Sequence, residues 1–149
     1  MSCPTSHSDL LPLPLPVDVS QRLVLRCLRR MAAHGIRDAQ AALLMLEHFG
    51  IHFRRPLVLL RAFVAELAQS AERRITLAPC CAMRMTLDEG RIVGALAAAA
   101  ENPVCASQHL QQLTGNSQIA SPLSLAAAFD ETLAGFNQSA RYNPAAPSA

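Results

Sequence analysis

Hydrophobic residues recur every three to four positions along most of the chain, which is the spacing of one face of an α-helix. In the first such segment Leu23, Cys27 and Met31 share one side, whereas Arg22 and Arg26 fall on the other. The same period returns in five further segments. The helices predicted in this way cover about residues 19–34, 38–49, 56–72, 86–100, 102–114 and 121–135.

Helix ends are marked by local signals. Gly35 and Gly50 are predicted stops, and Asp38 is a predicted N-cap. Thr86 and Glu89 have the spacing of a capping box, in which the hydroxyl bonds the Glu89 N–H and the carboxylate bonds the Thr86 N–H. Because the connections are short, we predict an all-α fold: a single compact domain of about six helices, bundle-like or orthogonal.

Three segments lack the helical period. Residues 1–17 form a Pro-rich leader in which LPLPLP favours extended backbone, and we expect this arm to pack its leucines on the domain. Residues 75–85 contain Pro79 and should cross the domain irregularly, without a second strand to pair with. Residues 137–149 read as a flexible tail, which leaves 18–136 as the helical domain.

Composition narrows the class of protein. The chain is 51% hydrophobic and 16% charged, so a packed core is expected. All thirteen basic residues are arginine, but the formal charge of +2 is too small to imply nucleic-acid binding. We find no apolar run long enough for a membrane span and no signal-peptide pattern. Five cysteines at irregular spacing fit a reducing compartment, so a cytoplasmic location is expected.

The vicinal cysteines Cys80 and Cys81 are the candidate site. Their Cα atoms lie about 3.8 Å apart, below the usual disulfide range, so a bond between them would be strained and easily reduced, as suits a redox switch. Two thiolates could also hold a soft metal, zinc or copper(I). A third interpretation is that both are small buried residues that anchor a loop.

Further metal ligands would come from elsewhere in the fold, because no second C-x-x-C or H-x-H pair is present. Glu89 could be a ligand or general base, although the capping box explains it more simply. His48 and His52 straddle Gly50 and so do not share a helix face. The possible additional ligands are Met83, Met85, Glu89, His34, His48, His52 and His109.

The arginines are a weaker candidate site. Arg22, Arg26 and Arg29 line one helix face, and the pairs at 54–55 and 73–74 flank the third helix. If they converged they would bind anions or nucleic acid, but a solvated face is the simpler interpretation. No phosphate loop, nucleophile elbow or zincin motif is present, so we predict no catalytic residue and no cofactor.

Two stretches carry a family resemblance. RRPLVLLRAFVAEL (54–67) and LAPCCAMRMTLDE (77–89) are similar to a family of small uncharacterised bacterial helical proteins, a domain of unknown function, over about residues 18–133. The resemblance implies a compact helical protein with the double-cysteine segment as its hallmark, and it implies no activity.

We therefore expect a small cytoplasmic helical protein that acts by binding or regulation, without catalytic activity. Its contact would be a protein partner or a second copy of the chain, at the leader or an uncovered helix face. The alternative is a soft-metal-binding or redox-sensing thiol protein that uses Cys80 and Cys81. A weaker alternative is anion or nucleic-acid binding by surface arginines.

Overall fold

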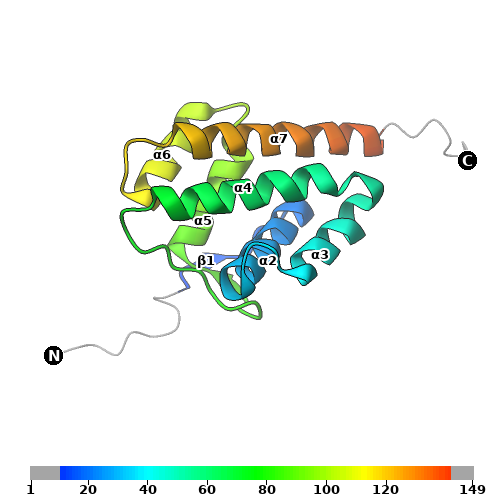
Figure 1. Cartoon of the computed structure of the whole chain (residues 1–149), viewed down its shortest axis with the longest axis horizontal. Coiled ribbons are helices and arrows are strands. Elements are labelled where there is room, and N and C mark those ends of the chain that lie inside the picture. The colour runs from blue at the N-terminus through cyan, green and yellow to red at the C-terminus, as the bar shows by residue number, and fades with distance from the viewer. Residues whose placement is uncertain (1–10, 142–149) are drawn as a thin grey trace, which may run out of the picture.

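The computed structural model describes the backbone of residues 11–141, and that part of the chain contains six α-helices and one small sheet (Figure 1). The all-α fold class is therefore confirmed. The helices are α2 (Val19–His34), α3 (Ala39–Phe49), α4 (Arg54–Ser70), α5 (Leu87–Ala98), α6 (Pro103–Thr114) and α7 (Ala120–Arg141). A 3-10 turn, η1 (Gly50–His52), joins α3 to α4. No described helix is both long and apolar enough to cross a membrane.

The predicted caps are present. The Asp38 carboxylate accepts from the Ala41 N–H at the start of α3. At α5 the Glu89 N–H donates to the Thr86 hydroxyl over 3.0 Å, and the Thr86 N–H donates to the Glu89 carboxylate over 2.9 Å. Gly35 ends α2 with a φ of 100°, a backbone conformation that other residues rarely adopt. Local hydrogen bonding thus sets these helix ends, as the sequence indicated.

The helices pack in pairs that cross one another. Helix α4 lies along α7, α5 packs against α6, and α2 packs against α3 (Figure 1). Helix α5 also contacts α2 and α7, so it lies between the pairs. Phe63 of α4 and Phe129 of α7 are fully buried in the shared core. Burial of these apolar faces supplies the main driving force for the arrangement.

The leader completes a two-stranded sheet. Strand β1 (Leu13–Pro14) pairs antiparallel with β2 (Arg84–Met85), and Leu13 lies opposite Met85. The Leu13 side chain packs on a small cluster that includes Leu25 and Val93. The leader therefore packs its leucines on the domain as expected, over its described part. The expectation that residues 75–85 lacked a pairing partner is wrong, because the Leu-Pro segment is that partner.

Helix α7 is longer than predicted. The expected stop near Gly135 is wrong: the helix continues to Arg141 and includes the first residues assigned to the tail. Gly135 lowers helix propensity by only about 1 kcal/mol, and packing offsets this cost. The Phe136 ring, one residue later, lies edge-on to Phe49 with ring centroids 4.8 Å apart. The remaining tail residues, 142–149, lie outside the described part of the chain.

Candidate functional site

The vicinal cysteines lie at the tip of the irregular segment between α4 and α5. A turn closed by the Ala82 N–H and the Pro79 carbonyl carries Cys80 and Cys81. Both cysteines are free and exposed to solvent. The interpretation that they are buried anchors of the loop is therefore wrong, and their sulfur atoms are accessible to reagents.

Arg29 of α2 holds this loop from the inside. Its Nη1 donates to the Ala82 carbonyl over 2.9 Å and its Nη2 to the Arg84 carbonyl over 2.8 Å. Its Nε donates to Glu89 over 2.7 Å, and its side chain is 2% exposed. The expectation that Arg29 projects from a solvated face is wrong. One guanidinium satisfies two loop carbonyls and a carboxylate, which its planar fork of donors makes possible.

Glu89 is the buried counterion of Arg29. Its side chain is fully buried, and Oε1 accepts from both the Thr86 N–H and Arg29 Nη2. The capping box and the ion pair together account for this carboxylate. The sequence indicated that Glu89 could be buried, since it shares a helix side with Ile92, and a buried charge requires a partner. The sequence did not indicate that Arg29 is this partner.

The other proposed metal ligands are dispersed. Met83 is 79% exposed, whereas Met85 is buried against Leu25. His48 packs on Phe49, and its ring is 3.4 Å from the Ser20 hydroxyl. Among the described residues, no three His, Cys, Asp or Glu side chains are gathered as a metal site. A metal at Cys80 and Cys81 stays a prediction, with no third ligand identified.

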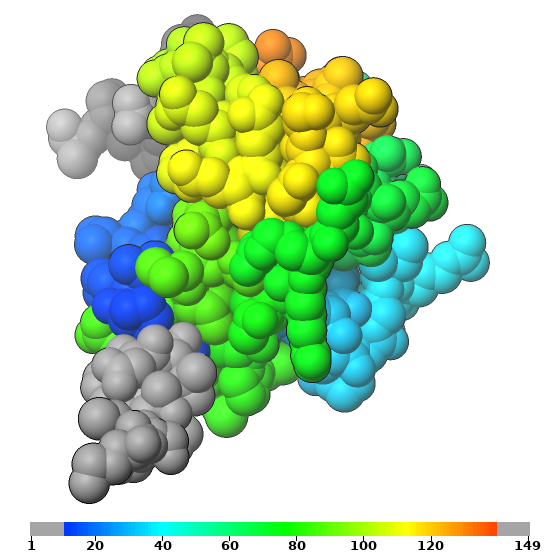
Figure 2. Space-filling model, turned by 90° about the vertical axis from the view of Figure 1, so that its left-hand side faces the viewer, coloured from blue at the N-terminus to red at the C-terminus, as the bar shows by residue number. Residues whose placement is uncertain are grey.

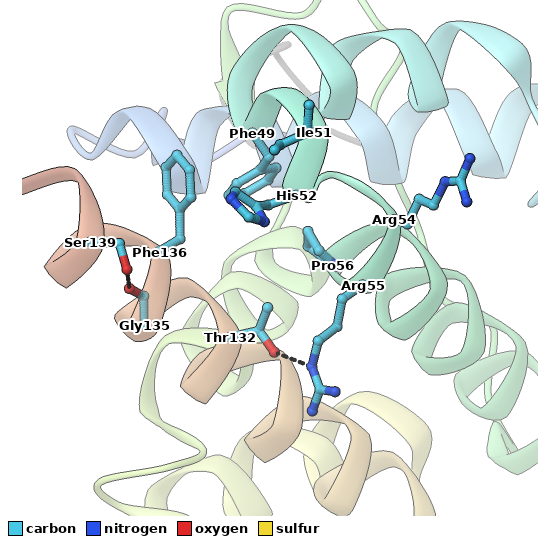
Figure 3. Close-up of a pocket in the computed structure, with 10 residues that line it drawn as sticks. All are labelled: Phe49, Ile51, His52, Arg54, Arg55, Pro56, Thr132, Gly135, Phe136 and Ser139. Atoms are coloured by element: carbon cyan, nitrogen blue, oxygen red, sulfur yellow. Dashed lines mark hydrogen bonds between the residues drawn. The ribbon is translucent and has the colours of Figure 1, made fainter.

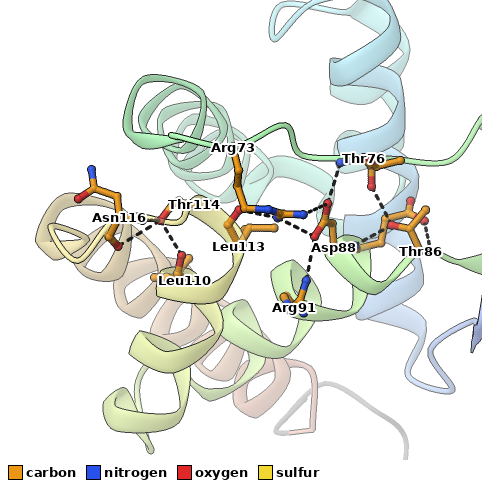
Figure 4. A network of polar contacts seen from close by, with 10 residues as sticks. Arg73, Thr76, Thr86, Asp88, Arg91, Leu110, Leu113, Thr114 and Asn116 are labelled. Carbon is orange, nitrogen blue, oxygen red and sulfur yellow. Dashed lines mark hydrogen bonds and ion pairs between the residues drawn. The ribbon is translucent and has the colours of Figure 1, made fainter.

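A second polar cluster pins the segment that leads to the cysteines (Figure 4). Asp88 is 4% exposed and accepts from Arg73 and Arg91 at 3.0 Å each, and from the Thr76 N–H at 2.8 Å. The Thr86 hydroxyl donates to the Thr76 carbonyl. Asp88 is therefore a buried acidic residue in the first turn of α5. Burial alone would raise the pKa of Asp88, but these hydrogen bonds hold it below its ordinary value.

The same segment forms one wall of an apolar groove of about 820 Å³. The C-terminal halves of α2 and α4 form the other walls, and Ile92 of α5 lies in the lining. Figure 2 shows the hollow between the irregular segment, in green, and the end of α2, in light blue. Sequence reasoning missed this groove, because it arises from the way three distant elements are spaced.

Several arginines bind main-chain carbonyls, and these do not form one patch. Arg22 donates to the Pro16 carbonyl and Arg61 to the Ile36 carbonyl, while Arg73 reaches the Leu113 carbonyl. A smaller hollow of about 410 Å³ lies where η1 and the start of α4 face α7 (Figure 3). There Arg55 donates to the Thr132 hydroxyl, and Arg54 points away. The predicted anion patch stays a prediction.

These features describe a compact all-α protein in which residues 79–82 form an exposed turn with two thiols, here called the dithiol turn. The buried Arg29–Glu89 pair holds this turn, and the apolar groove lies along the same irregular segment. The model of the family of unknown function DUF6628 matches residues 3–136, and the chain belongs to that family. The resemblance to a family of unknown function is thereby confirmed, over a longer stretch than expected. No curated protein and no solved structure matches the chain.

Proposed function

We propose that the protein is a small helical binding protein whose ligand is an amphiphile with an anionic head group. The apolar chain of the ligand would lie in the groove between α2, α4 and the segment 74–77. The observation that carries this proposal is the groove itself: its volume of about 820 Å³ falls within the range of small-molecule sites, roughly 300–1,000 Å³.

The lining of the groove suits a hydrocarbon chain. Ile36, Val64, Ile75 and Leu77 present partly or largely exposed apolar side chains to the groove. Beneath them Leu28, Met31, Leu67 and Ile92, each at most 4% exposed, form its floor. Each methylene group of a ligand removed from water onto such a surface contributes about 0.8 kcal/mol. The lining holds no carboxylate, histidine or cysteine. Its composition therefore supports binding and offers no general acid or base for catalysis.

Arg74 supplies the charge that selects the head group. It is the only charged residue in the lining, it is exposed, and it forms no ion pair among the described residues. Its neighbour Arg73 is occupied by Asp88, so it does not compete for the ligand. A carboxylate or phosphate suits a guanidinium because two oxygens of the anion can accept parallel N–H bonds.

The wall that carries Arg74 is held in place before any ligand arrives. The Thr76 N–H donates to Asp88, and the Thr76 carbonyl accepts from Thr86, so the backbone beside the groove is tied to the start of α5. A preorganised wall lowers the entropy cost of binding. The four described cysteines are free, which supports placing the protein in the reducing cytoplasm. Binding of a protein partner or a second copy stays a separate prediction.

Calorimetric titration of the full chain with dodecanoate, dodecylamine and dodecanol tests the proposal, with the two ionic ligands below their micelle concentrations and the alcohol below its solubility limit. We expect dodecanoate to bind most tightly and Arg74→Gln to remove its advantage over the alcohol, whereas Arg54→Gln should not. Ala68→Phe, which fills the groove, should weaken all binding. Its matched control is Gln69→Phe, at an exposed neighbour outside the lining. Absence of binding, or equal effects of these two Phe variants, would contradict the proposal.

A further inference from the structure

A second hollow, of about 440 Å³, lies beside one of the two exposed thiols. It is lined by Arg26 and Arg30 of α2, Gln40 and Leu44 of α3, and Cys80 of the turn. Two guanidinium groups therefore share one hollow with a free sulfur atom, and no carboxylate is in the lining. Helices α2 and α3 follow one another in the chain, but Cys80 is fifty positions from Arg30, and only the fold brings its turn to them.

The charge in this hollow is net positive. Arg30 donates through Nε and Nη2 to Asp38, at 3.0 and 2.9 Å, and its Nη1 takes no part in that ion pair. Arg26 is exposed and has no ion pair in the described part of the chain. One guanidinium is thus neutralised by Asp38 and the other is not.

Cys80 lies within reach of Arg30. The pKa of Arg30 is raised from its ordinary value chiefly by the hydrogen bond to Asp38, and to a smaller extent by its neighbour Cys80. A thiolate, not a thiol, is the nucleophile in disulfide exchange, and neighbouring cations stabilise it. The hollow also has room beside the sulfur for the rest of a small reagent.

We propose that Cys80 is a site of thiol–disulfide exchange with small disulfides that carry carboxylates. The Cys80 thiol releases its proton to water, and the thiolate attacks one sulfur of the reagent. A new S–S bond forms to Cys80, the S–S bond of the reagent breaks, and its second sulfur leaves as a thiolate. Arg26 binds a carboxylate of the reagent. The product is a mixed disulfide at Cys80, which a low-molecular-weight thiol removes by the same reaction in reverse.

Cys81 is the internal control for this site. It is exposed and free like Cys80 and belongs to the same turn, but it does not line the hollow. Exposure alone would make the two thiols equally reactive. The proposal instead predicts a preference for Cys80 that depends on the charge of the reagent. It does not rest on the ligand proposed for the groove, and its test needs no such ligand.

The test follows modification of each cysteine by peptide mapping after a short exposure of the reduced full chain to a disulfide in excess. Dithiobis(nitrobenzoic acid) is the anionic probe and cystamine is the cationic one. We expect the anionic probe to modify Cys80 about tenfold faster than Cys81, because local charge concentrates the reagent. Cystamine should show no such preference, and added salt should reduce the preference of the anionic probe.

Arg26→Gln should lower the rate of Cys80 with the anionic probe and leave the rate with cystamine unchanged or higher. Arg54→Gln, at an exposed arginine of α4 outside the hollow, should change neither rate. A Cys80→Ser variant should leave modification of Cys81 intact. Equal rates for Cys80 and Cys81 with the anionic probe, or a Cys80 preference that persists with cystamine, would overturn the proposal.

Discussion

Arg29 Nε donates to Glu89 Oε2 over 2.7 Å, although the two residues are sixty positions apart and neither side chain is more than 2% exposed. The pair joins α2 to the first turn of α5. Through its remaining nitrogens Arg29 also holds the carbonyls of Ala82 and Arg84. A single buried guanidinium therefore sets the position of the dithiol turn relative to the helical core.

Glu89→Gln should destabilise the protein by about 3–5 kcal/mol, because the substitution leaves the Arg29 charge buried without a counterion. Urea denaturation followed by circular dichroism measures the free energy of unfolding. Asp38→Asn is the matched control, since it removes a carboxylate from a more exposed arginine pair and leaves a side chain that can still cap α3. A loss for Glu89→Gln no larger than for Asp38→Asn would show that the buried pair is not important for stability.

The double variant Arg29→Met with Glu89→Gln should be more stable than Glu89→Gln alone, because no buried charge remains unpaired. Residues 79–84 should nevertheless stay less ordered than in the wild-type protein, since the Ala82 and Arg84 carbonyls have lost their donor. Hydrogen exchange should therefore be faster in residues 79–84 than in the wild-type protein. Unchanged exchange in this loop would indicate that other contacts hold it.

Asp88 should make stability depend on acid pH. Its folded-state pKa is lowered, so its contribution is present above the unfolded pKa of about 3.9 and is lost as pH falls through the folded value. The stability difference between the wild type and Asp88→Asn should be full at neutral pH and shrink below about pH 4. Urea denaturation at a series of pH values measures it. A difference that does not change with pH would contradict the assignment.

Asp130 should lower the stability of the protein as pH rises, which is opposite to the effect of Asp88. Its pKa is raised, first by burial and then by the charges of Glu101 and Glu131, so the folded state binds the proton more tightly than the unfolded state does. Ionisation above the folded pKa therefore costs stability. Asp130→Asn retains an oxygen that can accept the Ala100 N–H and removes the charge, and it should raise the melting temperature at neutral pH. Glu131→Gln, at an exposed neighbour, should have a smaller effect.

The rate of alkylation should distinguish the buried cysteine from the exposed ones. Cys27 is fully buried, and burial raises the pKa of its thiol to about 12. Iodoacetamide at mildly alkaline pH should therefore modify Cys80 and Cys81 in the native protein and Cys27 only after denaturation. Peptide mapping by mass spectrometry distinguishes the sites. Native modification of Cys27 at a rate similar to that of Cys80 would contradict this placement.

Much of the helical framework was readable from the sequence, because the signals are local. Apolar spacing predicted the helices, and the caps at Asp38 and Thr86 bond residues only three positions away. The end of α7 was missed at Gly135 because a contact between Phe136 and Phe49, far apart in the chain, outweighs a weak local preference.

The sequence by itself determined the fold class, most helix boundaries and the two adjacent thiols. Tertiary structure alone decided that Glu89 meets Arg29, that the leader pairs with β2, and that Cys80 lies beside Arg26 and Arg30. The physical reason is the distance along the chain over which each interaction acts. Helix period and capping depend on neighbours a few residues apart, whereas the burial of a charge and the surroundings of a thiol depend on how distant helices pack.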